Sequence, residues 1–380
     1  MYLAKKMWPT LATSLVAFTS LVNADSDSAQ MRNLENRVNA LEQRRGASGM
    51  INPSARPQVK DGADLFIFGE LLYWNAHENG LPVAVVQKGS ASNLSHSEVK
   101  NISFDWDVGF RLGLGYNLPH DGWDLSLSWL RFYPDGSARS HAGDNRHVFA
   151  SRAHPAAPYD AGDTVDGTKS SFQKMHSHVR LRLNQLDLDL GREFFVSKWL
   201  TLRPHFGLRA DWVRQKWDTE YKNQLTPGGV QTTNDLDVDY RDRWYGFGLE
   251  GGLDTQWGLG SGWSLFGNLT GAIVYGFHHL NVDNDNDPAV AVDTNGKFAD
   301  ANNRYRVSHP ILDLMLGLRY DTMFSCDRYH LGLQVGWEHH IYFSQNQFPV
   351  FVDRQAIGTF VANQGDLTLQ GWTLAARFDF

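Results

Sequence analysis

The sequence predicts an all-β fold: a transmembrane antiparallel β-barrel of about ten strands, with twelve strands as the alternative. Three observations lead to this prediction. Long stretches alternate apolar and polar residues, as strands with two different faces do. The connections between these stretches are alternately short and long, and aromatic residues gather at the ends of the stretches. Barrels that span a membrane combine these three features.

Residues 1–24 have the pattern of a secretory signal peptide. Two lysines precede a short apolar run, which small residues follow. The run is shorter than the ~20 residues that a spanning helix needs. We therefore expect cleavage between Ala24 and Asp25, so that the mature chain leaves the cytoplasm.

Residues 25–62 are predicted to form a periplasmic helical or coiled-coil segment followed by a linker. Four apolar residues recur at the spacing of a coiled-coil seam, namely Met31, Leu34, Val38 and Leu41. Two heptads are marginal as an isolated helix. Two interpretations stay open: a solvated amphipathic helix, and a short coiled coil that joins copies of the chain into a homo-oligomer.

Residues 63–380 are predicted to form the barrel, because ten runs in this region alternate. From Phe104 to Leu118 every second residue is apolar, and the residues between are polar or glycine. Wound as a helix, this run would be apolar on all sides. In the fourth run the alternation slips at Asn184 and Gln185, which predicts a bulge. The ten runs are 65–75, 104–118, 123–133, 179–190, 199–214, 243–257, 263–278, 309–321, 328–341 and 367–380.

Short and long connections alternate along the barrel sequence. The long ones are residues 76–103, 134–178, 215–242, 279–308 and 342–366. Short periplasmic turns and long external loops are typical of outer-membrane barrels. An even number of strands would place both termini on the periplasmic side and the long loops at the cell surface. Residues 347–363 could hold a further hairpin, which is the basis for the twelve-strand alternative.

The apolar face of each strand is predicted to point outward, toward lipid. Glycines sit on the polar face, where a lumen needs room, and the chain ends in an alternating strand with Phe378 and Phe380. Such an aromatic end resembles the assembly signal of outer-membrane barrels. Aromatic residues at strand ends would form the two interfacial girdles. These residues are Phe104, Trp106, Tyr116, Trp123, Trp199, Trp212, Trp257, Trp263, Tyr275, Phe277, Tyr329, Trp337 and Trp372.

Several segments resemble the Legionella-type major outer membrane protein family, whose relatives occur in chlamydia-like bacteria. The segments include FGELLYWNAHENGLPVAVV (Phe68–Val86), LRPHFGLRADW and RWYGFGLEGGLDTQW, and the resemblance covers about Asp64 to Phe380. It lies in the texture of the strands and in the first hairpin. The resemblance implies a pore-forming barrel, a porin, at the cell surface. A single cysteine, Cys326, excludes an intrachain disulfide.

Chemical motifs are weak in this chain. The net charge of −7 argues against a nucleic-acid partner. The glycines at Gly246–Gly251 fit a dinucleotide motif but lie inside a strand pattern. Acidic triplets at 283–287 and 235–239 favour solvated loops over calcium sites, because the first lacks the glycine and the closing glutamate. No catalytic spacing is present, so we expect neither an enzyme nor a cofactor, although an outer-membrane phospholipase or protease stays a weak alternative.

The charged residues on the polar face are candidates for lining a pore. They are Asp105, Asp107, Arg111, Arg203, His205, Arg209, Asp211, Glu250, Asp254, Asp313, Arg319 and Asp321. We expect a passive diffusion channel for small polar solutes, whose charges set its selectivity. The alternative is a non-conducting surface adhesin or envelope structural protein that the barrel anchors. Expected partners are outer-membrane lipid, lipopolysaccharide and the barrel-assembly machinery.

Overall fold

The computed structural model describes residues 52–88, 96–119, 121–143, 146–152, 171–225, 235–286, 297–351, 359–361 and 364–380. The predicted signal peptide, its cleavage site and the predicted coiled-coil seam lie outside the described residues. In the described ranges, no helix is long and apolar enough to cross a membrane.

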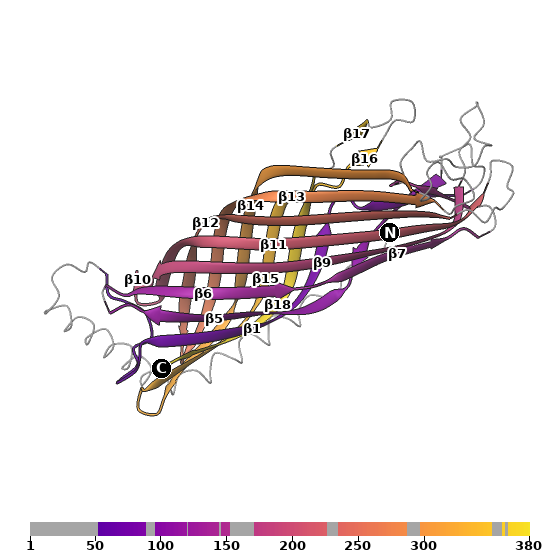
Figure 1. The fold of residues 1–380 in the computed structure, drawn as a ribbon. Coiled ribbons are helices and arrows are strands. Elements are labelled where there is room, and N and C mark those ends of the chain that lie inside the picture. The colour runs from indigo at the N-terminus through magenta and orange to yellow at the C-terminus, as the bar shows by residue number, and fades with distance from the viewer. Residues whose placement is uncertain are drawn as a thin grey trace, which may run out of the picture.

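Ten strands of the described chain close into one antiparallel ring (Figure 1). Each ring strand pairs with its neighbour along the chain, and β18 pairs with β1 to close the ring. The prediction of ten strands is therefore confirmed. The ring consists of β1 (Leu65–Glu78), β5 (Trp106–Asn117), β6 (Trp123–Phe132), β9 (Ser171–Arg192), β11 (Leu200–Leu225), β12 (Leu236–Gly260), β13 (Trp263–Asn286), β14 (Lys297–Phe324), β15 (Tyr329–Asn346) and β18 (Gly365–Asp379).

The remaining strands are short and decorate the ring. The hairpin expected within residues 347–363 exists as β16 and β17, which form a separate two-stranded sheet and add no strand to the ring. The short strands are β2 (Pro82–Lys88), β3 (Ser97–Asn101), β4 (Ser103–Phe104), β7 (Asp135–His141), β8 (Arg146–Ala150), β10 (Phe194–Phe195), β16 (Val350–Phe351) and β17 (Phe360–Val361).

The two ends of the barrel differ. At one end, here called the turn end, tight connections join β5 to β6, β12 to β13 and β14 to β15. Gly122 and Gly262 adopt φ angles of +71° and +81° there, which a glycine reaches without strain. The C-terminus also lies at this end (Figure 1), where the Phe380 N–H donates to the Leu65 carbonyl. At the other end, the extended end, β9 and β11–β14 run on well past the shorter strands.

The long strands continue through much of what the sequence predicted as loops. β11 reaches Leu225 and β12 begins at Leu236, so most of the expected loop over residues 215–242 is strand. The outward apolar positions of β11 run from Leu202 to Trp212, about the 9–11 residues that a tilted strand needs to cross a bilayer. The remainder of β11 therefore extends beyond the membrane.

The polar and apolar faces of β11 change places where the strand passes Trp212. Up to that residue the inward positions are polar, as at Arg209, and the outward ones are apolar, as at Phe206. Beyond it the large inward side chains are apolar, as at Trp217 and Tyr221, with Gln215 and Thr219 between them, and the outward positions are charged. In its first part β11 has lipid outside and a polar lumen inside. Past Trp212 it has water outside, and its apolar side chains therefore point inward.

The predicted bulge at Asn184 and Gln185 is wrong. The pairing of β9 with β11 runs through these residues without a shift, since Trp212 faces Asn184 and Asp211 faces Gln185. The slip in the pattern marks the exchange of faces instead. Leu181 and Leu183 are inward in the extended part of β9, whereas Leu186 and Leu188 are outward in the membrane part.

Phe104 was predicted to be an outward girdle residue, and this is also wrong. Phe104 belongs to the two-residue strand β4, is 5% exposed and packs inside the extended end. Asp105 separates β4 from β5, so the side-chain alternation does not continue across it. The other predicted girdle residues are exposed or half-buried on the outer surface.

The membrane part of the barrel carries its apolar side chains outward, as predicted. Leu249 and Leu316 are 68% and 65% exposed, and many leucines of neighbouring strands are similarly open. A continuous apolar band of this size marks a lipid surface. Aromatic contacts along its extended-end border include Tyr73–Trp106, with 5.2 Å between ring centroids, and Trp337–Trp372, with 5.4 Å.

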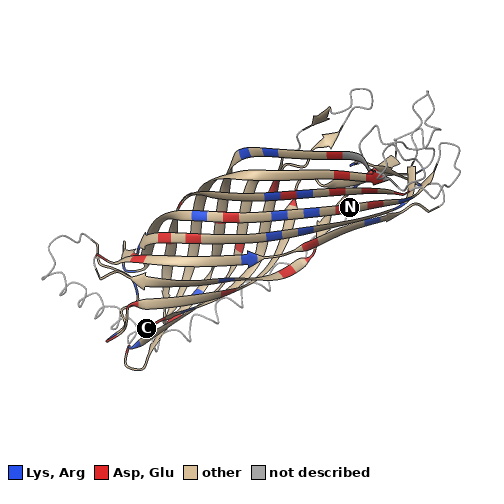
Figure 2. Ribbon diagram, in the orientation of Figure 1, with Lys and Arg blue, Asp and Glu red and all other residues tan. Residues whose placement is uncertain are grey.

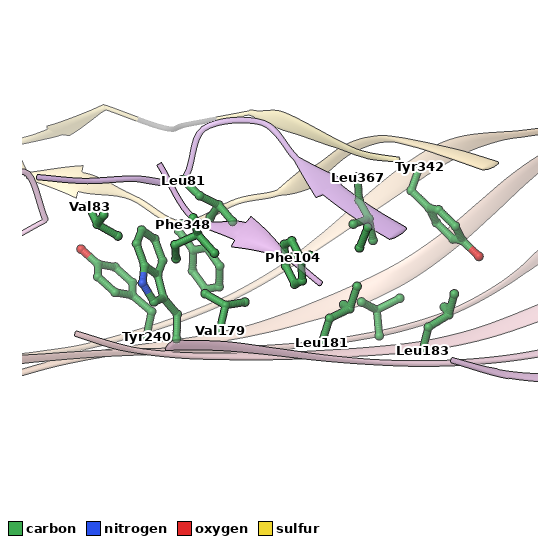
Figure 3. Close-up of a cluster of buried hydrophobic side chains, with 14 of the residues drawn as sticks. Leu81, Val83, Phe104, Val179, Leu181, Leu183, Tyr240, Tyr342, Phe348 and Leu367 are labelled. Carbon is green, nitrogen blue, oxygen red and sulfur yellow. The ribbon is translucent and has the colours of Figure 1, made fainter. Parts of the chain in front are cut away.

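The inside of the extended end is filled by apolar side chains (Figure 3). We call this group the cap cluster. The wall strands contribute residues such as Val179 and Tyr240, while Leu81 and Phe348 come from segments that fold into the barrel. The residues labelled in Figure 3 are Leu81, Val83, Phe104, Val179, Leu181, Leu183, Tyr240, Tyr342, Phe348 and Leu367.

Because outward positions face lipid in one part of the barrel and water in the other, the effect of a new outward charge on stability should depend on its position. Leu249→Arg places a charge against hydrocarbon and should lower the free energy of unfolding by about 2–4 kcal/mol. Asn281→Arg, on the outward face of β13 beyond Phe277, should change it by no more than about 0.5 kcal/mol. Denaturant unfolding of the barrel refolded in lipid vesicles measures both variants. Equal losses would contradict the assignment of the two positions to lipid and water.

Candidate functional site: the charged barrel interior and its cap

Arg209 is the centre of an ion-pair cluster inside the membrane part of the barrel. It is 3% exposed. Its Nε lies 3.0 Å from Asp187 Oδ1, its Nη2 lies 2.8 Å from Glu250 Oε2, and its Nη1 lies 2.6 Å from Asp313 Oδ2. Arg209 is on β11 and Asp313 is on β14, which is not a neighbouring strand. The contact with Asp313 therefore crosses the lumen, whereas Asp187 and Glu250 lie on the neighbouring wall strands β9 and β12.

A second arginine, Arg111, joins the opposite wall to this cluster. Its guanidinium pairs with Glu70 of β1 and with Glu338 of β15, at 2.7 Å in the latter case. His340 then lies 3.0 Å from Glu338 and 2.6 Å from Asp313. The interior charges thus form one connected set, which we call the central belt: Glu70, Arg111, Asp187, Arg209, Glu250, Asp313, Glu338 and His340.

A second belt of charges lies nearer the turn end. Arg203 Nε donates to Asp124 at 3.0 Å, and its Nη1 donates to Asp254 at 2.9 Å. On the other wall His330 lies between Asp321, at 3.0 Å, and Asp379, at 2.7 Å. The turn-end belt is completed by His205, Arg319 and Arg377, which pair with these carboxylates.

Both belts contain more carboxylates than arginines. Asp211 is an inward acid next to the central belt that is fully buried, and neither of its carboxylate oxygens has a hydrogen-bond partner among the described residues. Within the same residues, no group of three or more His, Cys, Asp or Glu side chains has the geometry of a metal site. The described interior of the membrane part is therefore lined by charged groups of both signs.

Glycines on the inward face make room for neighbouring rings. A Cβ at Gly113 would lie 2.1 Å from Phe68, and one at Gly115 would lie 2.1 Å from Phe66. The sequence predicted that such glycines leave room in the lumen. In β5 that room is occupied by side chains of β1, and Arg377 lies over the Phe66 ring at 3.9 Å from its centroid.

The structure places most of the predicted pore-lining residues on the inward face of the two belts or next to them. Asp107 is half-buried near the extended end, where its Oδ2 accepts from the Asp135 N–H at 3.1 Å. Asp105 is exposed at the break between β4 and β5, outside both belts. The inward residues are Arg111, Arg203, His205, Arg209, Asp211, Glu250, Asp254, Asp313, Arg319 and Asp321. Whether they line a conducting pore stays a prediction.

Sequence reasoning missed several members of the belts. Asp187 was missed because the pattern around it suggested a bulge, although it shares the parity of the inward residues of β9. Glu70 and Glu338 lie at polar positions of predicted strands, and strict use of parity would have found them. The other missed residues are Asp124, His330, His340, Arg377 and Asp379.

The cap cluster fills the extended end of the barrel. Two of its aromatic residues hydrogen-bond within it: Trp217 Nε1 donates to Ser177 Oγ at 2.7 Å, and Tyr342 O–H donates to Gln185 Oε1 at 2.9 Å. Arg152 lies over the Trp217 ring, 4.6 Å from its centroid, and its Nε donates to the Pro82 carbonyl at 3.0 Å. The cap is therefore a packed apolar layer, and an ion crossing it would lose its hydration.

Two histidines connect the wall to the base of the cap. His278 Nδ1 lies 2.9 Å from Asp242, its Nε2 lies 2.8 Å from His309 Nε2, and His309 Nδ1 lies 2.9 Å from the Phe343 carbonyl. Carboxylate and carbonyl oxygens accept, so these contacts favour a proton on each Nδ1 atom. The two rings thus link Asp242 on the wall to the backbone at Phe343. Phe343 precedes the inward segment that carries Phe348.

Comparison with known proteins gives one family match. The model of the family described as Legionella pneumophila major outer membrane protein precursor matches residues 56–380. No curated protein matches the chain.

Solved structures that resemble this one include three outer-membrane proteins. The outer membrane protease OmpT from Escherichia coli is 8% identical, with a TM-score of 0.39 over 86% of this chain and 99% of the other. A major outer membrane protein from Thermus thermophilus is 12% identical, with a TM-score of 0.25 over 83% and 98%. The Pseudomonas putida toluene transporter TodX is 11% identical, with a TM-score of 0.29 over 87% and 93%. Likeness at this level says nothing about what the present chain binds.

Glu78 makes the stability of the cap depend on pH. Burial raises the pKa of Glu78 from 4.5 to about 8, against the hydrogen bond from Gln215 Nε2, which lowers it. Between these pH values the folded cap holds a proton that the unfolded chain releases, so stability falls as pH rises through this window and levels off above it.

We therefore expect Glu78→Gln to remove this part of the pH dependence. Thermal unfolding of wild type and variant between pH 4.5 and 9 measures the difference. The wild type should lose stability relative to the variant as pH rises, and parallel profiles would contradict the buried position of Glu78.

Proposed function

The chain belongs to the family of the Legionella pneumophila major outer membrane protein, and on that basis we propose that it is a passive diffusion channel for small polar solutes in the bacterial outer membrane. The observation that carries the proposal is the pair of charged belts inside the membrane part of the barrel. Their ion pairs cross the lumen at two levels.

Buried ion pairs are an expensive way to fill a barrel. Apolar side chains of similar volume would often stabilise the fold as well or better, because they avoid the cost of dehydrating the charges. A barrel that served only as an anchor would have no use for so many interior charges. A channel does have a use for them, because charges that face a solute path hold water and ions there.

The excess of carboxylates over arginines favours cations. Arg209 and Arg203 each pair with more than one carboxylate. Carboxylates outnumber arginines by five to two in the central belt, and on this basis we propose that the channel passes small cationic and neutral polar solutes more readily than anions.

The cap cluster describes a closed state in this account. Conduction requires the inward segments around Leu81 and Phe348 to move away from the wall. The packed cap also favours the second candidate, a non-conducting barrel that presents surface loops, and conductance separates the two. No feature of the belts calls for a catalytic role or a cofactor, and both expectations stay predictions.

We propose that the turn end faces the periplasm and the extended end faces the outside. Both the first and the last ring strand reach the turn end, where Phe66 faces Asp379. Phe378 and Phe380 there would serve the assembly machinery, and a cleaved signal peptide would precede a periplasmic segment. Oligomer formation through Met31, Leu34, Val38 and Leu41 belongs to the same proposal.

Planar-bilayer recording of the refolded protein tests conduction. We expect small discrete steps with a cation preference. Phe348→Ala should raise the open fraction several-fold, because it removes a large cap side chain, while leaving the step size unchanged, since the belts set the narrowest part. Phe360→Ala, an exposed residue of the small β16–β17 sheet, is the matched control. Absence of steps in wild type and in Phe348→Ala would support the non-conducting alternative.

Cys326 reports the orientation. It is exposed in the turn between β14 and β15, at the turn end. A maleimide joined to a large polymer cannot cross the outer membrane, so it should leave Cys326 unlabelled on intact cells and label it after lysis. Equal labelling in both samples would place the turn end outside and overturn the proposed orientation.

A further inference from the structure

Three arginines lie directly opposite one another on the outer surface of the barrel. Arg214 of β11 faces Arg182 of β9 on one side and Arg243 of β12 on the other. All three side chains are exposed. We call these three residues the arginine row. It continues to His279 of β13 and Arg304 of β14, which face Arg243 and one another in turn.

The arginine row borders the lipid-facing surface. One side-chain repeat nearer the turn end, about 7 Å along the strands, β11, β12 and β13 present Trp212, Tyr245 and Phe277, and β9 presents Asn184. These aromatic residues are the girdle at the extended end of the membrane part. The arginines are therefore at the level of lipid headgroups rather than out in free solution.

The row lacks the carboxylates that its neighbours have. One repeat further toward the extended end, Arg180 and Lys216 both pair with Asp218, at 3.0 and 2.6 Å, and Arg241 pairs with Asp239 at 3.4 Å. Across the described part of the chain, no carboxylate lies within ion-pair distance of Arg182, Arg214 or Arg243. Figure 2 shows the blue positions side by side on these strands and red positions beyond them.

Like charges directly opposite one another destabilise a sheet. Three adjacent strands each contribute an arginine at the same register, so the three positive charges repel one another. A bound anion would remove this repulsion. Guanidinium groups bind phosphate oxygens in pairs of hydrogen bonds, which makes phosphate the anion that suits a row of arginines best. The arginine row lies next to the aromatic girdle, at the level of the lipid headgroups, so the phosphate that fits this position is one carried by a lipid.

We propose that the arginine row binds the phosphate groups of a phosphorylated glycolipid, the lipid A part of lipopolysaccharide, in the outer leaflet. The proposal rests on the orientation given above, with the extended end outside, and is independent of conduction. The girdle residues Trp212, Tyr245 and Phe277 would contact the acyl chains of the lipid whose phosphates the arginines hold.

The test compares a triple variant with a control of equal charge change. Arg182→Gln/Arg214→Gln/Arg243→Gln removes the row. Arg139→Gln/Lys174→Gln/Lys222→Gln removes three exposed cations about 20–26 Å further along the same side of the barrel. Native mass spectrometry of each refolded protein in detergent counts bound diphosphorylated lipid A, dephosphorylated lipid A and phosphatidylglycerol.

We expect the wild type and the control to bind diphosphorylated lipid A equally within about twofold, and the row variant to bind it at least about tenfold more weakly. Dephosphorylated lipid A should bind the wild type as weakly as the row variant binds the phosphorylated form. Unchanged binding by the row variant would overturn the proposal. So would equal row-dependent binding of phosphatidylglycerol, which would show an unspecific attraction to anionic lipid.

Failure of this proposal is distinguishable from failure of the proposed function. Conductance and Cys326 labelling are measured on the same two triple variants. If the protein shows no conductance but still binds lipid A through the arginine row, the proposed channel function fails and the lipid A site stands. If Cys326 is labelled on intact cells, the proposed orientation fails, and the assignment of the row to the outer leaflet fails with it.

Discussion

The surroundings of each strand change along its length, and the rest of the structure depends on this constraint. Over the membrane part the outward side chains meet hydrocarbon, so they are apolar, and the closed ring pairs the backbone of each strand with two neighbours. Beyond Trp212 and its counterparts the outward side chains meet water, so charged residues take the outside and apolar ones go inside. One uninterrupted strand therefore runs from lipid into water, and its apolar face changes from the outside of the barrel to the inside.

The two kinds of interior follow from this exchange. The membrane part encloses polar side chains, which pair with one another because ten strands enclose a narrow lumen. Arg209 and Arg111 do so by reaching across the lumen to acids on non-adjacent strands. The extended part encloses an ordinary apolar core, in which Trp217 and Phe348 pack with 5.7 Å between ring centroids. The cap cluster, which would close a channel of this kind, therefore lies outside the membrane.

Much of the ring was predictable from the sequence, because period-two alternation is a local property. The ten strands, their turn-end limits and the inward parity of residues such as Arg203 and Glu250 follow from the pattern alone. The limits of the strands at the extended end did not follow from it, because the outward apolar face of β11 stops at Trp212 although the strand continues to Leu225. The alternation of inward and outward side chains nevertheless continues past Trp212. Val213 and Trp217 point inward, as Arg209 and Asp211 do nearer the turn end.

The partners within the site were less predictable than its members. That Arg209 meets Asp313 depends on the closure and stagger of the whole ring, which no local pattern records. The cap was missed for a similar reason, because Leu81 and Phe348 lie in segments between ring strands and fold inward only in the assembled barrel. Asp105 and Phe104 were misplaced because a single residue between β4 and β5 breaks the alternation.

A nitroxide scan along β11 tests the exchange of faces most directly. Single spin labels from Phe206 to Tyr221, in the protein refolded into bilayers, are exposed in turn to oxygen, which concentrates in lipid, and to a water-soluble nickel complex. The account predicts high oxygen access at every second position up to Trp212, and high nickel access at those same outward positions from Arg214 onward. Oxygen access that continues with the same period through Lys216 and Asp218, or that never alternates, would contradict it.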